Sequence, residues 1–186
     1  GTYSSPIKSA GRRFFTMLGT LVQGRVSLDG AAAWTSALGL KIAITYGNER
    51  RQFNSGPGTE ETVLLDYARH QRRLLPRLAT TYASIFAHDE FLVKFDAVFS
   101  GKADTDGDRE DLETLAAALK PLSTWHALDT LQEAREACGG SGFMFENRLV
   151  GLRADLDVYA TFEGDNNVLL QLVGKRLLTD FATQFR

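Results

Sequence analysis

The residues with the clearest chemical potential follow one another in the segment Thr161-Phe162-Glu163-Gly164-Asp165-Asn166-Asn167. A carboxylate set between the aromatic residues Tyr159 and Phe162 and a flexible glycine is a candidate general base. The same segment also suits an ordinary helix start, in which Asp165 or Asn166 caps the helix and Gly164 makes the turn. Spacing alone does not choose between these two interpretations.

A glycine cluster, Cys138-Gly139-Gly140-Ser141-Gly142-Phe143, forms the second candidate site. Glycines let backbone N–H groups approach an anion closely, because no Cβ intrudes and left-handed dihedral angles are accessible. A helix that simply ends at glycine has the same sequence signature. The cluster by itself is therefore weak evidence for phosphate contact.

Other polar groups give no support for a metal site or a catalytic triad. The segment from Asp104 to Asp108 has alternating carboxylates, but its glycine is misplaced for a calcium loop, so we interpret it as a solvated turn and helix cap. His70, His88 and His126 lack partners at metal-ligand spacing and are expected to be surface or helix-face residues. The single cysteine, Cys138, excludes an internal disulfide and a four-thiolate zinc site.

Length and composition describe one globular domain. The chain has 186 residues, of which 44% are hydrophobic and 24% charged, and 21 basic against 23 acidic side chains leave a net charge of -2. This balance gives no basic footprint for nucleic acid, and no apolar stretch approaches the ~20 residues of a membrane span. We expect a cytoplasmic (bacterial) protein, with the peroxisomal matrix as the alternative.

Apolar residues recur at helical spacing in four stretches. Helices are predicted over 26–51, from Thr59 as far as Phe99 with a bend or interruption at Pro76, through Leu112 to Cys138 with a kink at Pro121, and from Val168 to the C-terminal residues. No segment alternates like a strand, and the first of these helices has apolar residues on most faces, including the line of Trp34, Leu38 and Ile42, so it should be central. The fold class predicted is all-α, an up-and-down four-helix bundle.

The domain organisation expected from this pattern has two parts. Residues 1–23 look less regular and are interpreted as a linker or the tail of a missing preceding domain, while residues 24–186 form the helical bundle domain. The chain is therefore expected to be a fragment of a longer polypeptide.

Four motifs in order resemble the C-terminal helical domain of the acyl-CoA dehydrogenase and acyl-CoA oxidase superfamily, from about Gly24 onward. They are Glu-Arg-Arg-Gln-Phe at 49–53, the segment 60–76 that ends in Leu-Leu-Pro, Ala-Cys-Gly-Gly-Ser-Gly-Phe at 137–143, and Thr-Phe-Glu-Gly-Asp-Asn at 161–166. Phe-Glu-Gly-Asp-Asn in particular is similar to the oxidase branch, where plain dehydrogenases more often carry Tyr-Glu-Gly-Thr.

The resemblance implies that Glu163 is the catalytic base. In that family the glutamate of this turn removes the pro-R proton from the α-carbon of an acyl-CoA thioester, while the β-carbon gives a hydride to N5 of FAD. Gly164 and Arg25 are implied to lie at the substrate beside this base. No metal takes part.

The resemblance also implies a set of FAD-binding residues. Arg50 is implied to reach the pyrophosphate of the neighbouring subunit's FAD, which suits a guanidinium that binds phosphate oxygens in pairs. Gln52 and Phe53 flank it. The full implied set is Arg50, Gln52, Phe53, Gly139 and Gly140 against the partner's cofactor, and Asp165 and Asn167 against the cofactor of their own subunit.

The function implied is FAD-dependent oxidation of acyl-CoA to trans-2-enoyl-CoA in fatty acid β-oxidation, with oxygen as electron acceptor. Two alternatives remain open: an acyl-CoA dehydrogenase that passes electrons to an electron-transfer flavoprotein, and a non-catalytic dimerisation bundle. Relatives also have an N-terminal helical domain and a middle β-domain, and form a homodimer or a dimer of dimers. We therefore expect the 186 residues by themselves to be inactive and to bind FAD poorly.

Overall fold

A computed structural model describes residues 2–54, 56–103 and 105–185, and within these ranges the chain is almost entirely helical. The helices are α1 (Ala10–Leu18), α2 (Leu21–Glu49), α3 (Ala68–Phe99), α4 (Asp106–Ala137), α5 (Leu149–Asp157) and α6 (Asn166–Thr183). Short 3-10 turns are η1 (Leu64–Asp66), η2 (Gly139–Phe143), η3 (Phe145–Asn147) and η4 (Val158–Ala160). The all-α class predicted from the sequence is confirmed.

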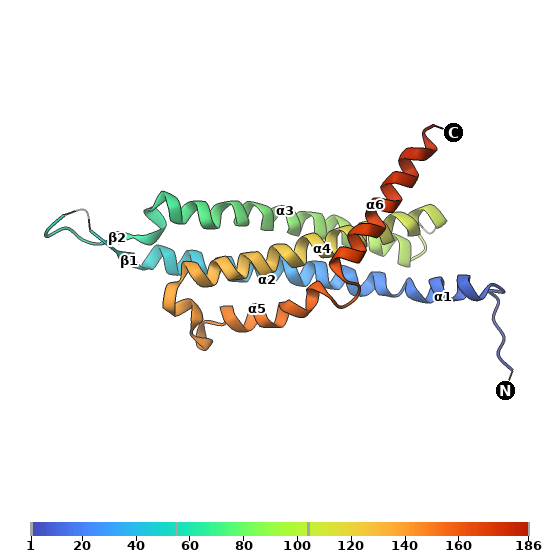
Figure 1. Ribbon diagram of the computed structural model, residues 1–186, viewed down its shortest axis with the longest axis horizontal. Helices are drawn as coiled ribbons and strands as arrows, with labels where there is room; N and C mark the ends of the chain where they lie inside the picture. The colour runs from blue at the N-terminus through green and yellow to red at the C-terminus, as the bar shows by residue number, and fades with distance from the viewer. Residues whose placement is uncertain (1, 55, 104, 186) are drawn as a thin grey trace.

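The helices form a long bundle around α4. Helices α2, α3, α4 and α5 run along the long axis, whereas α6 crosses the others and projects away from them (Figure 1). Helix α4 packs against α2, α3, α5 and α6, so it takes the central place that the sequence suggested for α2. Trp34 and Leu38 on α2 are 60% and 45% exposed, because one apolar face of α2 is left uncovered by the described chain.

Two groups of buried side chains hold the bundle together. One lies toward the α5 end and the other joins the beginning of α2, the end of α3 and the beginning of α4. Fully buried alanines on α2 and α4 let the two backbones approach closely, and burying apolar surface supplies the main driving force for folding. These alanines are Ala32, Ala33, Ala43, Ala116, Ala117, Ala127 and Ala134.

The segment between α2 and α3 differs from the prediction. A two-stranded antiparallel hairpin, β1 (Arg51–Gln52) and β2 (Thr62–Val63), occupies it, and α3 begins at Ala68 rather than at Thr59. The Thr59 hydroxyl donates to the Gly56 carbonyl at 2.7 Å and accepts from the Gly56 N–H at 3.2 Å, so it closes a loop instead of capping a helix. Two-residue strands are too short to show alternation.

Two further differences concern the number of helices and the effect of proline inside them. Helix α5 was not predicted, and the segment before Gly24, expected to be less regular, contains α1. Helices α3 and α4 continue through Pro76 and Pro121, so of the bend or interruption expected at Pro76 the interruption is wrong. Thr105 caps α4 through a reciprocal pair of bonds with Asp108, as expected for that turn, whereas Asp104 lies outside the described residues.

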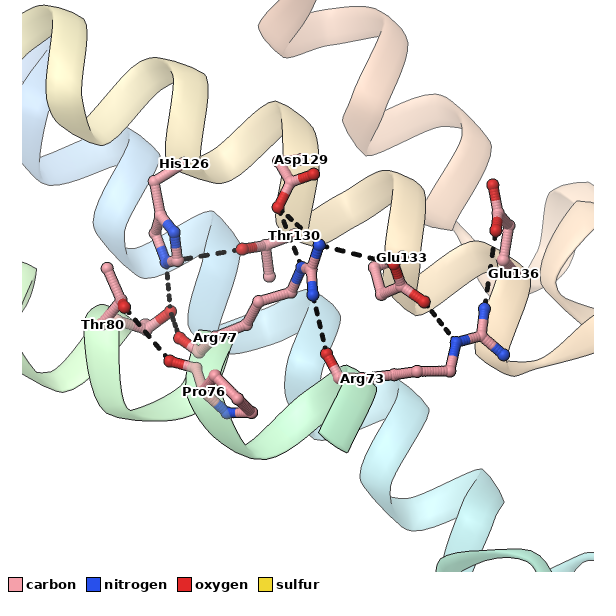
Figure 2. A network of polar contacts seen from close by, with 10 residues as sticks. Arg73, Pro76, Arg77, Thr80, His126, Asp129, Thr130, Glu133 and Glu136 are labelled. Atoms are coloured by element: carbon pink, nitrogen blue, oxygen red, sulfur yellow. Dashed lines mark hydrogen bonds and ion pairs between the residues drawn. The ribbon is translucent and has the colours of Figure 1, made fainter. Parts of the chain in front are cut away.

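An ion-pair network ties α3 to α4 near Pro76 (Figure 2). Arg77 donates to Asp129 at 2.9 Å and lies 3.4 Å from Glu133, and Arg73 pairs with the same Glu133. The Arg77 guanidinium also donates to the Arg73 carbonyl at 2.9 Å, on the turn where proline disturbs the helical bonding. One carboxylate shared by two arginines fixes the register of the two helices.

The histidines are more buried than expected. His70 and His88 are each 8% exposed, and His88 Nδ1 lies 2.9 Å from the buried carboxylate of Asp29. His126 sits beside the ion-pair network, with Nε2 at 2.8 Å from the Thr81 hydroxyl. All three lie on helices, which was one of the two possibilities expected from the sequence, and His70 and His88 are buried rather than on the surface.

We expect stability to fall as the pH drops below about 6.5, the ordinary histidine value. Burial, the largest cause, lowers the pKa of His126 and of His70. A base whose pKa is depressed in the folded state stabilises the fold when neutral, and this contribution is lost as the pH falls through the depressed value. Urea unfolding midpoints should therefore decline between pH 7.5 and pH 5, with a shallower slope in His126→Gln. An equal slope in that variant would contradict the assignment.

No helix in the described ranges has the length and apolar character needed to cross a membrane.

Candidate functional site

The candidate base lies on a strained turn between η4 and α6. Glu163 has φ +54°, in the left-handed region that a non-glycine residue seldom occupies, and Gly164 follows with φ +104°. Such a conformation persists only where the surroundings hold it in place. The rings of Tyr159 and Phe162 pack together with centroids 5.1 Å apart on the approach to this turn. The aromatic setting expected for Glu163 is therefore present.

The Glu163 side chain lies across the beginning of α2. A Cβ built on Gly24 would come within 2.8 Å of Glu163 Cδ and of Oε2. Glycine at position 24 therefore leaves the space that the carboxylate fills. Within the described chain, Oε2 is buried and has no hydrogen-bond partner. A buried carboxylate oxygen without a partner is costly for stability and is characteristic of a group kept for a ligand or a reaction.

Two buried cations bind the backbone of the same turn. Arg25 Nε donates to the Glu163 carbonyl at 3.0 Å, and Lys120 Nζ donates to the Gly164 carbonyl at 2.8 Å. Burial lowers the pKa of Arg25, partly offset by the charges of Glu113 and Glu163. Burial, followed by the charge of Arg25, lowers the pKa of Lys120 to about 8, against the opposing effects of Asp165 and Glu163. Positive charge therefore lies on two sides of the turn that carries the Glu163 carboxylate.

Asp165 caps helix α6. Its Oδ1 accepts from the N–H groups of Asn167 at 2.9 Å and Val168 at 3.3 Å, so the capping interpretation of the sequence is confirmed. Asn166 is 1% exposed and bonded inside the bundle, whereas Asn167 is exposed on the first turn of the helix. The segment thus caps a helix and also presents a carboxylate. The two interpretations of the sequence are compatible.

Two of the residues expected to bind substrate meet at the base. Arg25 contacts the Glu163 backbone, and Gly164 shares its strained turn. The guanidinium of Arg25 is 3.5 Å from where a Cβ on Gly164 would lie. The structure brings these three residues together.

The remaining candidates lie at the opposite end of α2. Arg50 directly follows the last residue of that helix, and Gln52 is in β1. Phe53 comes next, with φ +60° and its side chain 67% exposed. Residues 25 and 49 are separated by ~36 Å of helix at 1.5 Å per residue. Arg50 and Glu163 of one chain therefore do not share a site.

The glycine pair belongs to the Arg50 end. Helix α4 ends beside η2, and a shallow groove is lined by Tyr46 and Glu49 of α2 together with Cys138 and Ser141. Gly139 has φ +58°, and a Cβ on Gly139 or Gly140 would meet no described atom within 4 Å. The backbone there is open to a ligand.

Both ends fit FAD by their chemistry. At one end, the exposed Arg50 and the open glycine backbone offer a cation and unobstructed peptide groups, which suit a diphosphate. At the other end, the unpartnered Oε2 of Glu163 suits a base working beside a redox ring. Each end supplies only part of a cofactor site.

Gly24 and Lys120 of the turn's environment were not predicted from the sequence, and Asn166 was considered only as a helix cap, whereas it bonds to Lys120 and Thr124 inside the bundle. Lys120 left a detectable signal, because it occupies the apolar stripe Leu112, Ala116, Lys120 of α4 at four-residue spacing. A lone lysine at such a position is either exposed by a kink or buried for a reason. Gly24 left no signal distinguishable from an ordinary helix glycine.

Comparison with known proteins agrees with this geometry. The family model described as acyl-CoA oxidase, C-alpha1 domain, matches residues 18–178. A putative peroxisomal acyl-coenzyme A oxidase 3.2 of Arabidopsis thaliana is 42% identical over 98% of this chain and 26% of its own length. Human peroxisomal acyl-coenzyme A oxidase 3 is 42% identical over 99% of this chain and 27% of its own length.

Solved structures give the same result. Acyl-CoA oxidase 1 of Yarrowia lipolytica superposes with a TM-score of 0.81 at 34% identity, covering 90% of this chain and 26% of that protein. Acyl-CoA oxidase-2 of Caenorhabditis elegans, bound with FAD, ascaroside-CoA and ATP, superposes with a TM-score of 0.86 at 26% identity over 98% of this chain and 27% of that protein. The chain thus spans about a quarter of the length of these relatives. It belongs to the acyl-CoA oxidase family and comprises the helical C-alpha1 domain of that family.

Proposed function

We propose that this chain supplies the catalytic base and part of the flavin site of an FAD-dependent acyl-CoA oxidase. The overall reaction converts acyl-CoA and oxygen to trans-2-enoyl-CoA and hydrogen peroxide. The observation that carries the proposal is the buried, unpartnered Oε2 of Glu163 on a strained turn between two cations. Family membership supports it, since the relatives are named acyl-CoA oxidases.

In this proposal Glu163 removes the proton from the α-carbon of the thioester. The electron pair left behind becomes the new α,β double bond as a hydride leaves the β-carbon. FAD held beside Glu163 would supply the acceptor for that hydride and the route by which two electrons reach oxygen. Arg25 and Lys120 bind two carbonyls of the Glu163 turn and so hold the carboxylate in one place for the proton transfer.

A second copy of the chain would complete the cofactor site. Because Arg50 lies a helix length from Glu163, we propose that Arg50, Gln52, Phe53, Gly139 and Gly140 hold the pyrophosphate end of a partner's FAD. Asp165 and Asn167 would face the FAD of their own subunit, although the Asp165 carboxylate is already committed to capping α6. We therefore propose a homodimer, singly or as a dimer of dimers, in which further domains of a longer chain complete the site.

The location that best fits the relatives is the peroxisomal matrix. Several of them are named peroxisomal. These names favour the peroxisomal matrix, given above as the alternative location, over the bacterial cytoplasm, which they do not support. Fatty acid β-oxidation is the process proposed.

The test is turnover by the full-length protein that contains this chain. We expect hydrogen peroxide and 2-enoyl-CoA in equal amounts when an acyl-CoA is added in air to the FAD-loaded enzyme. Peroxide is measured with a coupled peroxidase dye and the enoyl product by its ultraviolet absorbance. Flavin that is reduced by acyl-CoA but stays reduced in air until an electron-transfer flavoprotein is added would show a dehydrogenase instead. Flavin that acyl-CoA never reduces would favour a non-catalytic bundle.

A further inference from the structure

A buried lysine supports the Glu163 turn from behind. Lys120 on α4 is fully buried, and its ammonium donates to the Gly164 carbonyl at 2.8 Å and to Asn166 Oδ1 at 2.8 Å. Asn166 Nδ2 donates to the Thr124 hydroxyl at 3.0 Å, and that hydroxyl donates to the Lys120 carbonyl at 2.8 Å. Lys120, Asn166 and Thr124 thus form a closed ring of hydrogen bonds, and the bond from Lys120 to the Gly164 carbonyl ties this ring to the turn.

Among the residues that the structure describes, no carboxylate forms a direct ion pair with this ammonium that would offset the cost of its burial. Both of its hydrogen-bond acceptors are neutral carbonyl oxygens, and the nearest opposing charges, Asp165 and Glu163, act on it without a hydrogen bond. The depressed pKa of Lys120 reflects that burial. An apolar side chain would pack in the same space without the desolvation penalty. A role beyond stability therefore accounts for lysine at this position.

Lys120 binds the carbonyl of Gly164, the residue immediately after the proposed base. Arg25 from α2 binds the Glu163 carbonyl, and Lys120 from α4 binds the Gly164 carbonyl, so two consecutive carbonyls are fixed from two different helices. Glu163 has a left-handed backbone there, which a free turn would abandon for a conformation that an L-residue prefers. Releasing either carbonyl lets the turn relax and moves the carboxylate.

We propose that Lys120, with Asn166, is a positioning residue for the base, holding the Glu163 turn in its strained conformation so that the carboxylate stays over Gly24. This inference rests on the proposed function of Glu163. Lys120 does not touch the reacting atoms. It acts through the Gly164 carbonyl.

The test uses Lys120→Met in the full-length FAD-loaded enzyme, because methionine fills similar space and cannot hydrogen-bond the turn. We expect kcat to fall ~10- to 100-fold, the cost of a misplacement near 1 Å, while KM for acyl-CoA changes little. The matched control is Leu131→Ala, a fully buried residue of the same helix that packs far from the turn. That variant should lose stability and keep kcat.

A second readout needs no turnover. A 3-thia-acyl-CoA has sulfur in place of the β-carbon, so it cannot give up a hydride, yet its α-protons remain acidic. Exchange of these protons with D2O, followed by mass spectrometry, reports the position of the base alone. Lys120→Met should slow the exchange as much as it slows kcat. In Lys120→Ala, added propylamine should restore part of the exchange by entering the vacated space, whereas it should not help Glu163→Gln.

The outcomes separate the two proposals. Wild-type exchange in Lys120→Met, with Glu163→Gln inactive, would overturn the positioning role and leave the proposed function intact. Wild-type exchange in Glu163→Gln would overturn the function itself. If Lys120→Met does not fold, Asn166→Ala decides: slower exchange at unchanged KM supports the ring's role, and unchanged exchange overturns it.

Discussion

Glu163→Gln in the full-length enzyme should reduce kcat by about 10²- to 10⁴-fold, the range that a positioned general base contributes. Glutamine keeps the size of the side chain and can occupy the same turn, but it cannot accept the α-proton. Binding of acyl-CoA and of FAD should persist, because the residues proposed to hold them are untouched. The loss therefore falls on kcat rather than on KM.

The measurement is a single turnover. Acyl-CoA is mixed with the oxidised enzyme without oxygen, and bleaching of the flavin absorbance is followed in time. Asp157→Asn serves as the control, because this exposed carboxylate ends α5 only six residues before Glu163. The control should bleach at the wild-type rate. Rapid bleaching in Glu163→Gln would mean that another group takes the proton.

The long helices were predictable because each repeats its apolar pattern over many turns. The hairpin and α5 were not. Leu149, Leu152 and Leu156 have helical spacing, but α5 has nine residues and begins after Arg148, which has φ +68° and gives no side-chain cap. Periodicity needs a longer window to be decisive, and here contacts with α4 determine the structure.

The candidate site, too, has one part that could be predicted from the sequence and one part that could not. The motif around Glu163 was visible in the sequence, since its residues are contiguous and resemble a known family. The groups that shape it, Gly24 and Lys120, come from two other helices and are 139 and 43 positions away, so only the packing of α2 and α4 against the turn reveals them. A side chain's hydrogen-bond partners across helices cannot be derived from local spacing. The apolar face of α2 that carries Trp34 and Leu38 was expected to be buried, but local spacing does not show which face of a helix its neighbours cover.

Gly24→Ala should damage activity while leaving the fold intact. A Cβ at this position would meet Glu163 Cδ and Oε2 at 2.8 Å and Cγ at 3.3 Å. The obstacle is the end of a flexible side chain, so folding is maintained, and alanine adds up to about 1 kcal/mol of helix propensity. The carboxylate, however, must leave its place. We expect kcat to fall ~10- to 100-fold, with an equal or higher melting temperature.

Gly174→Ala separates displacement of the base from general stiffening of a helix. Gly174 lies inside α6, and a Cβ there would meet no described atom within 4 Å, so this variant should gain stability at unchanged kcat. Equal losses of kcat in both variants would argue against a specific effect at the base.

A double-mutant cycle then tests the contact itself. Aspartate is one methylene shorter than glutamate, so in the Glu163→Asp background the added methyl of Gly24→Ala meets less of the side chain. If the 2.8 Å approach is the cause, Gly24→Ala should cost less in that background than in the wild type. Strictly additive losses would place the effect of residue 24 elsewhere on α2, and the carboxylate would then have to reach the substrate from a direction other than across this glycine.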